Sequence, residues 1–166
     1  MDHIFWKLYL SGLLKTVIVD RSEETGKFTK GEELANAISH LTGALLGVAA
    51  LVLMVVFSAK NGTAWHIVST AVFGATLVIL YLSSMFTHWL PQGRTKEFFF
   101  TMDQIAIFML IAGTYTPIAL ITLHGPFGWV IFGTEWGLAV TGIVIKLLRP
   151  VKYAAGVSAF YIILYA

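Results

Sequence analysis

Long stretches without a charged residue are the feature that most constrains how this chain can fold. No Asp, Glu, Lys or Arg lies between Leu34 and Lys60, and none occurs from Ala64 to Gln92. A helix needs about 20 apolar residues to cross the ~30 Å hydrocarbon core of a bilayer, and both stretches are long enough. The run from Leu45 to Ser58 is apolar on every side of a helix, which a small soluble bundle could not cover. We therefore expect an integral membrane protein.

The composition agrees with a membrane protein. Of the 166 residues, 57% are hydrophobic and 12% are charged, about half of the roughly 25% of charged residues in a soluble domain. The chain has no cysteine, which excludes disulfides and thiolate metal ligands. Five apolar segments separated by turn clusters predict an all-α, polytopic transmembrane helix bundle over residues 32–166; they run roughly over 35–58, 64–90, 98–123, 127–147 and 153–166.

The last segment is too short to cross a bilayer. Its 14 residues would extend about 21 Å as a helix, short of the ~30 Å core. We therefore expect that the chain given is a fragment and that its transmembrane domain is incomplete at the C-terminus. Gly43 and Gly47, by contrast, form a pattern of small residues four apart that suits close packing of membrane helices.

Residues 1–31 are predicted to be a separate cytoplasmic or interfacial segment. Their apolar run, Leu8 to Leu14, is too short to span and is flanked by Lys7 and Lys15. An amphipathic helix lying on the membrane surface explains this pattern. A signal peptide is the alternative, but two lysines interrupt its apolar stretch and no small-residue cleavage site follows.

The basic residues predict the orientation of the helices. Ten of the eleven Lys and Arg residues fall within 1–33, 91–97 and 146–152, which lie on one side of the membrane if the segments alternate. Only Lys60 falls on the other side. Because basic residues accumulate in cytoplasmic loops, the N-terminus is expected inside the cell.

Polar and ionisable side chains within the segments are candidates for function, because such groups are costly in a membrane. Three lie on one face at the start of the first segment, two lie four apart at the end of the second, and two lie in the third: Glu33, Asn36, His40, Ser84, His88, Asp103 and Thr114. The predicted topology gathers five of them in the inner-leaflet half: Glu33, His40, Ser84, His88 and Asp103. Glu135, inside the fourth segment, has no assigned role.

This combination of side chains permits three interpretations. Histidine and carboxylate ligands suit Zn²⁺, which would turn a bound water into a nucleophile for hydrolysis. The same residues could form a proton relay. The polar groups could also do no more than lock neighbouring helices together.

Several motifs resemble the bacterial hemolysin III family, which is related to the progestin and adipoQ receptors. The run from Glu33 to His40 (ELANAISH) resembles the opening helix of that family. Ser84 to His88 (SMFTH) looks like its Ser-x-x-x-His element. Met102-Asp103 and Ile111–Pro117 (IAGTYTP) are similar to its third-helix signature, and the resemblance extends from about residue 31 to the end.

The resemblance implies a seven-helix membrane fold with a cytoplasmic N-terminus, of which about four and a half helices are present here. It also implies zinc near the inner leaflet and hydrolysis of an amide-linked lipid, because the receptor branch is linked to both. By this match His88 would bind the metal, and Ser84 and Asp103 would be the catalytic residues around the metal-bound water. The remaining polar residues would support them: Glu33, Asn36, His40 and Thr114.

The chain departs from the family pattern at three places. Thr87 replaces a tyrosine, Gln104 replaces a histidine, and the two C-terminal histidines that complete the family's metal site have no counterpart before Ala166. One histidine and one carboxylate do not close a zinc site, which needs three protein ligands and a water. The chain as given is thus expected to lack part of its site.

The predicted function is a zinc-dependent hydrolase of a lipid amide in the bacterial plasma membrane. Membrane lipids are the expected partners, and no nucleic acid is expected. The alternatives are a membrane-perturbing or pore-forming cytolysin, which the amphipathic N-terminal segment would serve, and a signalling protein without catalytic activity.

Overall fold

The computed structural model describes residues 28–148. They form four long helices, α2 (Lys30–Asn61), α3 (Ala64–Trp89), α4 (Arg94–Pro117) and α5 (Gly125–Leu148), with a short π-helix, η1 (Ile118–Leu123), continuing α4. With α4 and η1 taken together, all four are long and apolar enough to cross a membrane. The predicted all-helical, membrane-spanning fold and its first four segments are confirmed. The interfacial helix predicted within residues 1–31 and the segment 153–166 lie outside the described residues.

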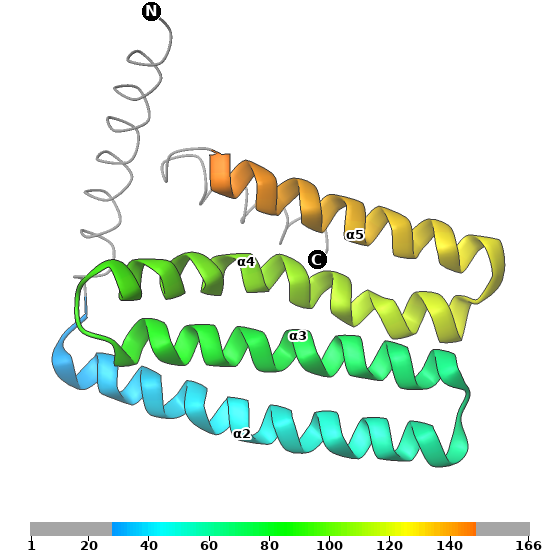
Figure 1. Cartoon of the computed structure of the whole chain (residues 1–166), viewed down its shortest axis with the longest axis horizontal. Helices are drawn as coiled ribbons and strands as arrows, with labels where there is room; N and C mark the ends of the chain where they lie inside the picture. Colours follow the sequence, from blue (N-terminus) through cyan, green and yellow to red (C-terminus); the bar gives the residue numbers. More distant parts are fainter. Residues whose placement is uncertain (1–27, 149–166) are drawn as a thin grey trace, which may run out of the picture.

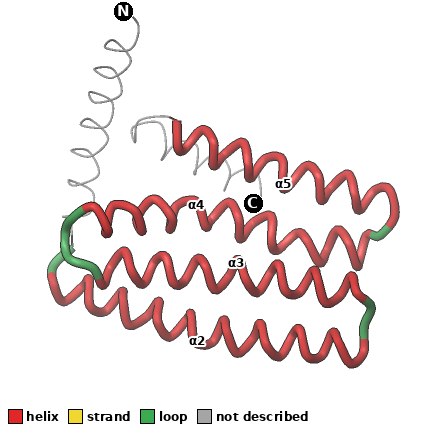
Figure 2. The backbone as a smooth tube through the Cα atoms, in the orientation of Figure 1, coloured by secondary structure: helices red, strands yellow, loops and turns green. Residues whose placement is uncertain are grey.

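The helices lie side by side in chain order and alternate in direction (Figure 1). α3 packs against α2 and α4, and α5 packs against α4 and η1. Within residues 28–148, the backbone of α2 comes close only to that of α3, and the side chain of Glu33 reaches Lys96 of α4. The connections are short and lie at the two ends of the row (Figure 2). One end therefore gathers the start of α2, the end of α3, the start of α4 and the end of α5; we call it the site end.

Small residues pack the helices together and large apolar residues face outward. The buried residues of α2 are Ala37, Ala44, Gly47 and Ser58. On its outer surface, Leu46, Leu53 and Phe57 are 67–70% exposed. Such an apolar surface is unfavourable in water but favourable in lipid. Membrane helices associate by close approach through small side chains. The described residues thus have the exterior of a membrane protein.

Glycines allow the closest approaches between helices. Gly74 of α3 packs against Leu51 of α2, and Gly113 of α4 packs against the side chain of Thr76 on α3. The predicted packing role of Gly43 and Gly47 is also seen, because both face side chains of α3. A Cβ added at Gly74 would come within 3.1 Å of the Leu51 backbone, whereas one added at Gly47 would make ordinary van der Waals contact at 3.5 Å.

The boundaries of the helices have local causes. α2 begins in a capping box, in which the Thr29 side chain accepts from the backbone N–H of Glu32 and the Glu32 carboxylate accepts from the N–H of Thr29. α4 ends at Pro117, whose ring cannot donate a backbone hydrogen bond, and the chain continues as the wider turn of η1. Beside it, the Thr116 hydroxyl donates to the carbonyl of Ala112 and accepts from the indole of Trp136, which ties α5 to α4.

Gly74→Ala is expected to destabilise the helix row. An added Cβ would lie 2.9 Å from Cβ and 3.1 Å from Cα of Leu51, and such overpacking costs about 1–3 kcal/mol. The thermal unfolding midpoint in detergent should fall. Gly133→Ala is the matched control, since nothing lies within 4 Å of its Cβ position. Equal midpoints for the two variants would contradict the described α2–α3 packing.

The orientation can be tested with single cysteines, because the chain has none of its own. Asn61→Cys lies at the end of α2 and Thr95→Cys at the site end. An impermeant maleimide should label residue 61 in intact cells and residue 95 only after permeabilisation, since the basic residues predict a cytoplasmic site end. The reverse labelling pattern would invert the topology.

Candidate functional site

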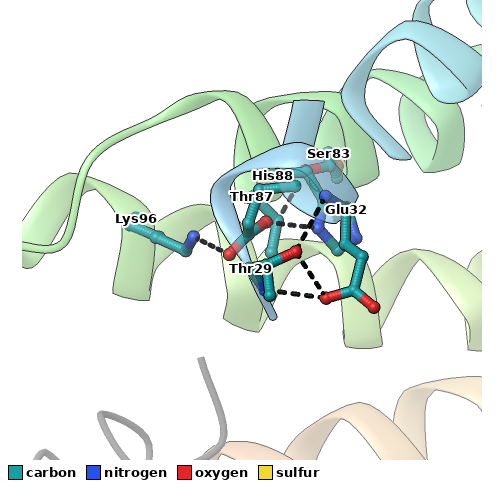
Figure 3. A network of polar contacts seen from close by, with 7 residues as sticks. Thr29, Glu32, Ser83, Thr87, His88 and Lys96 are labelled. Carbon is teal, nitrogen blue, oxygen red and sulfur yellow. Dashed lines mark hydrogen bonds and ion pairs between the residues drawn. The ribbon is translucent and has the colours of Figure 1, made fainter. Parts of the chain in front are cut away.

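The carboxylate of Glu33 joins three helices at the site end. Its Oε1 accepts a hydrogen bond from Nζ of Lys96 at 2.6 Å, and its Oε2 lies 2.7 Å from Nδ1 of His88. Figure 3 shows this network, with Lys96 and His88 approaching from α4 and α3. The side chains are 16% exposed for Glu33, 17% for His88 and 5% for Lys96. A carboxylate and an ammonium with so little solvent exposure stabilise each other, because an unpaired buried charge is strongly unfavourable.

The local sequence places these groups where they can meet. The capping box at Thr29 fixes the first turn of α2, to which Glu33 belongs. The turn between α3 and α4 ends at Gly93, whose φ of 152° favours glycine. α4 therefore starts one residue later, and Lys96 lies in its first turn on the buried side.

A second polar pair links α3 to α4. The Ser84 hydroxyl donates a hydrogen bond to Oδ1 of Asp103. Ser84 is buried, at 8% exposure, and Asp103 is half-buried. A hydrogen bond to a carboxylate is strengthened in such a low-dielectric setting. Ser84 lies one helical turn before His88, so the two pairs are neighbours along α3.

Aromatic rings hold the His88 imidazole in place. The His40 ring stacks on it with centroids 5.5 Å apart and planes 8° from parallel. Phe28 meets His88 edge-on at 5.9 Å, and Tyr81 lies 6.2 Å from His40 on a tilted plane. The ring of His88 is thus confined by His40 of α2, by Phe28, which precedes the N-cap residue of α2, and by the carboxylate of Glu33.

A cavity of about 580 Å³ adjoins the Glu33–His88 pair. It lies between the start of α2 and the end of α3, and most of its lining is apolar, including Leu34 and Trp89. Its polar part comes from five side chains: Lys30, Glu33, His88, Gln92 and Lys96. An amphipathic molecule, with its polar group near His88 and its apolar part along Leu34 and Trp89, matches this lining.

The structure brings together five of the residues singled out from the sequence. They share the site end and contact one another in pairs or stacks: Glu33, His40, Ser84, His88 and Asp103. Asn36 is half-buried and joins neither pair. Thr114 is exposed and donates to the carbonyl of Leu110; it lies eleven residues after Asp103, about 16 Å along α4. The structure therefore does not place Thr114 in the cluster.

Lys96 is the site residue that sequence reasoning missed, because its place in the basic stretch 91–97 indicates only the topology. A signal for it does exist. Lys96 precedes Asp103 by seven residues, which puts both on the same face of α4. Glu135 is a different case: it is buried in α5, and within residues 28–148 its Oε2 has no hydrogen-bond partner.

The described residues do not by themselves fit a zinc ion. Among them, no group of three or more His, Cys, Asp or Glu side chains is arranged to hold a metal. A catalytic zinc needs three protein ligands and an open position. His88 nevertheless has a feature of metal-binding histidines, because one of its ring nitrogens is held by a carboxylate.

Comparisons with known proteins agree with the sequence motifs. Residues 28–166 match a family described as Haemolysin-III related. The chain is 40% identical over 133 residues to Hemolysin-3 of Bacillus cereus and 41% identical over 137 residues to the Hemolysin-3 homolog of Bacillus subtilis (strain 168). The alignments cover 80% and 82% of this chain but 61% and 64% of the relatives, so the chain spans less than two thirds of their length. No solved structure matches.

Breaking the ion pair from one side should cost more than removing it entirely. Glu33→Ala leaves the Lys96 ammonium buried without its partner, which should lower the free energy of unfolding by about 3 kcal/mol. The double variant Glu33→Met, Lys96→Met replaces both charges by apolar groups and should recover much of that loss. Thermal unfolding in detergent measures the difference. A double variant less stable than Glu33→Ala would contradict the described pair.

Proposed function

We propose that this chain, which belongs to the haemolysin-III related family, carries the polar site of a membrane hydrolase that cleaves an amide bond in a lipid. The observation that carries the proposal is the meeting of two polar pairs, Ser84–Asp103 and Glu33–His88, at one end of membrane-spanning helices. Ionisable groups are rare in such helices and mark functional sites. The orientation proposed from the basic residues puts this end at the inner leaflet of the bacterial plasma membrane.

Asp103 is the proposed general base. Ser84 donates to Oδ1 and thereby fixes the carboxylate, which leaves Oδ2 to take a proton from a water molecule. The water oxygen then adds to the amide carbonyl carbon, the C–N bond breaks, and the departing nitrogen receives the proton that Asp103 took from the water. A positioned carboxylate of this kind contributes roughly 10²–10⁴-fold to a hydrolysis rate.

The lining of the cavity supports a lipid as substrate. Leu34 and Trp89 offer apolar contact for an acyl chain, while Lys30 and His88 offer polar contact for a head group. The cavity lies at the helix ends, which is the level of the head groups in a bilayer. The amide class itself follows from the resemblance of Ser84–His88 and Ile111–Pro117 to proteins linked with ceramide hydrolysis.

Among the described residues, His88 is the only zinc ligand that we propose. Glu33 holds Nδ1, and Nε2 has no hydrogen-bond partner among the described residues, so Nε2 is the atom we assign to a metal. The further ligands would come from outside residues 28–148. No step of the reaction above depends on the ion.

Asp103→Asn should reduce hydrolysis of an amide-linked lipid by about 10²-fold or more, because the amide cannot take the proton from water. Release of fatty acid in proteoliposomes of the full-length protein measures the rate. Thr114→Ala is the matched control on the same helix, since Thr114 is exposed and bonds only its own helix. A normal rate in Asp103→Asn would overturn the proposed role.

Zinc content tests the metal assignment separately from activity. The purified full-length protein should contain zinc, and His88→Ala should lose it, because a site deprived of one of three protein ligands binds weakly. His66→Ala, at the opposite end of the row, should retain it. Zinc retained in His88→Ala, or absent from the folded wild type, would remove the metal from the proposal.

A membrane-perturbing cytolysin is the second candidate, favoured by the names of the two Bacillus relatives, Hemolysin-3 and Hemolysin-3 homolog. Lysis of red cells would then not depend on the site. If the protein lyses cells equally well with Asp103→Asn and in the presence of a chelator, the cytolysin replaces the hydrolase. A protein that neither lyses cells nor hydrolyses lipid would leave the polar groups with a helix-locking role in a signalling protein.

A further inference from the structure

We propose that Glu33, held by Lys96, is a positioning residue that keeps His88 in the tautomer with its proton on Nδ1 and a free lone pair on Nε2. Only the use of Nε2, as a metal ligand or as a proton acceptor, rests on the proposed function. The tautomer itself follows from contacts among described residues.

The contact between Glu33 and His88 selects the position of the proton. Oε2 and Nδ1 are 2.7 Å apart, a distance at which two acceptors without a hydrogen between them would repel. An ionised carboxylate can only accept, so Nδ1 has to donate. In a neutral imidazole one nitrogen donates and the other accepts, and Nε2 is therefore the acceptor.

Lys96 makes Glu33 a fixed acceptor instead of a mobile one. Its ammonium donates to Oε1 at 2.6 Å, while Oε2 faces His88, so the two oxygens have separate partners on α4 and α3. Lys96 also balances the carboxylate charge.

The rings around His88 also fix the orientation of its imidazole. His40 stacks on the face of the imidazole with planes 8° apart, and Phe28 contacts it edge-on. Rotation of the ring would break the stack and the hydrogen bond to Glu33 together. With Nδ1 pointing to Glu33, Nε2 is held on the opposite side of the ring, in the fixed direction that a ligand or proton acceptor requires.

Nitrogen NMR of ring-labelled histidine in the full-length protein tests this inference. Spectra above about pH 8, where an ordinary imidazole is neutral, report which ring nitrogen carries the proton. The His88 signals are those lost in His88→Gln. We expect Nδ1–H in the wild type. In Glu33→Met, Lys96→Met, the ratio of Nδ1–H to Nε2–H should fall roughly tenfold or more, the factor that a hydrogen bond to a charged group carries.

Lys96→Arg alone is the matched control, because it keeps the carboxylate of Glu33 and a cationic partner for it, and should keep the Nδ1–H tautomer. A wild type with the proton on Nε2, or with a charged ring, would overturn the inference, and so would an unchanged tautomer ratio in the double variant. The spectra require no substrate. The expected tautomers in a protein that does not hydrolyse lipid amides would therefore support the positioning role while refuting the proposed function.

Discussion

The pairing of polar groups inside hydrocarbon is the constraint on which the rest of this structure depends. A spanning helix satisfies its own backbone, and here many of its hydroxyls also bond within the helix, as Ser83 does to the carbonyl of Ile79 and Thr87 to that of Ser83. A carboxylate has no such local solution. Glu33 therefore takes Lys96 from one neighbouring helix and His88 from another. That requirement fixes the relative placement of α2, α3 and α4 at the site end.

The same requirement gives the site its chemical character. Each carboxylate of the cluster is held by a donor from another helix, Asp103 by Ser84 and Glu33 by Lys96 and His88. Groups held in this way do not reorganise when charge develops during a reaction, which is the main advantage of a preorganised site. Large apolar side chains face outward along the row, and the cavity beside His88 lies at the site end.

Much of the fold could be predicted because the membrane makes hydropathy and charge decisive. The four described helices and the gathering of Glu33, Ser84, His88 and Asp103 at one end followed from apolar length and from alternation of direction. The side-chain partners could not be predicted from apolar length and alternation of direction. Helical spacing gives the face of a residue but not the depth or register at which two helices meet, so it indicates neither the contact of Lys96 with Glu33 nor the position of Thr114 outside the cluster. The partner of Lys96 depends on how α4 meets α2, and Thr114 lies outside the cluster because it is eleven residues beyond Asp103 on α4.

A double-mutant cycle between Ser84 and Asp103 tests most directly whether α3 and α4 meet as described. The free energy of unfolding would be measured in detergent for Ser84→Ala, Asp103→Ala and the pair. Because the two side chains share one hydrogen bond, the account predicts an interaction energy of about 1 kcal/mol or more between the substitutions. Effects that add within about 0.3 kcal/mol, the behaviour of independent sites, would show that the two side chains do not meet and would contradict the site.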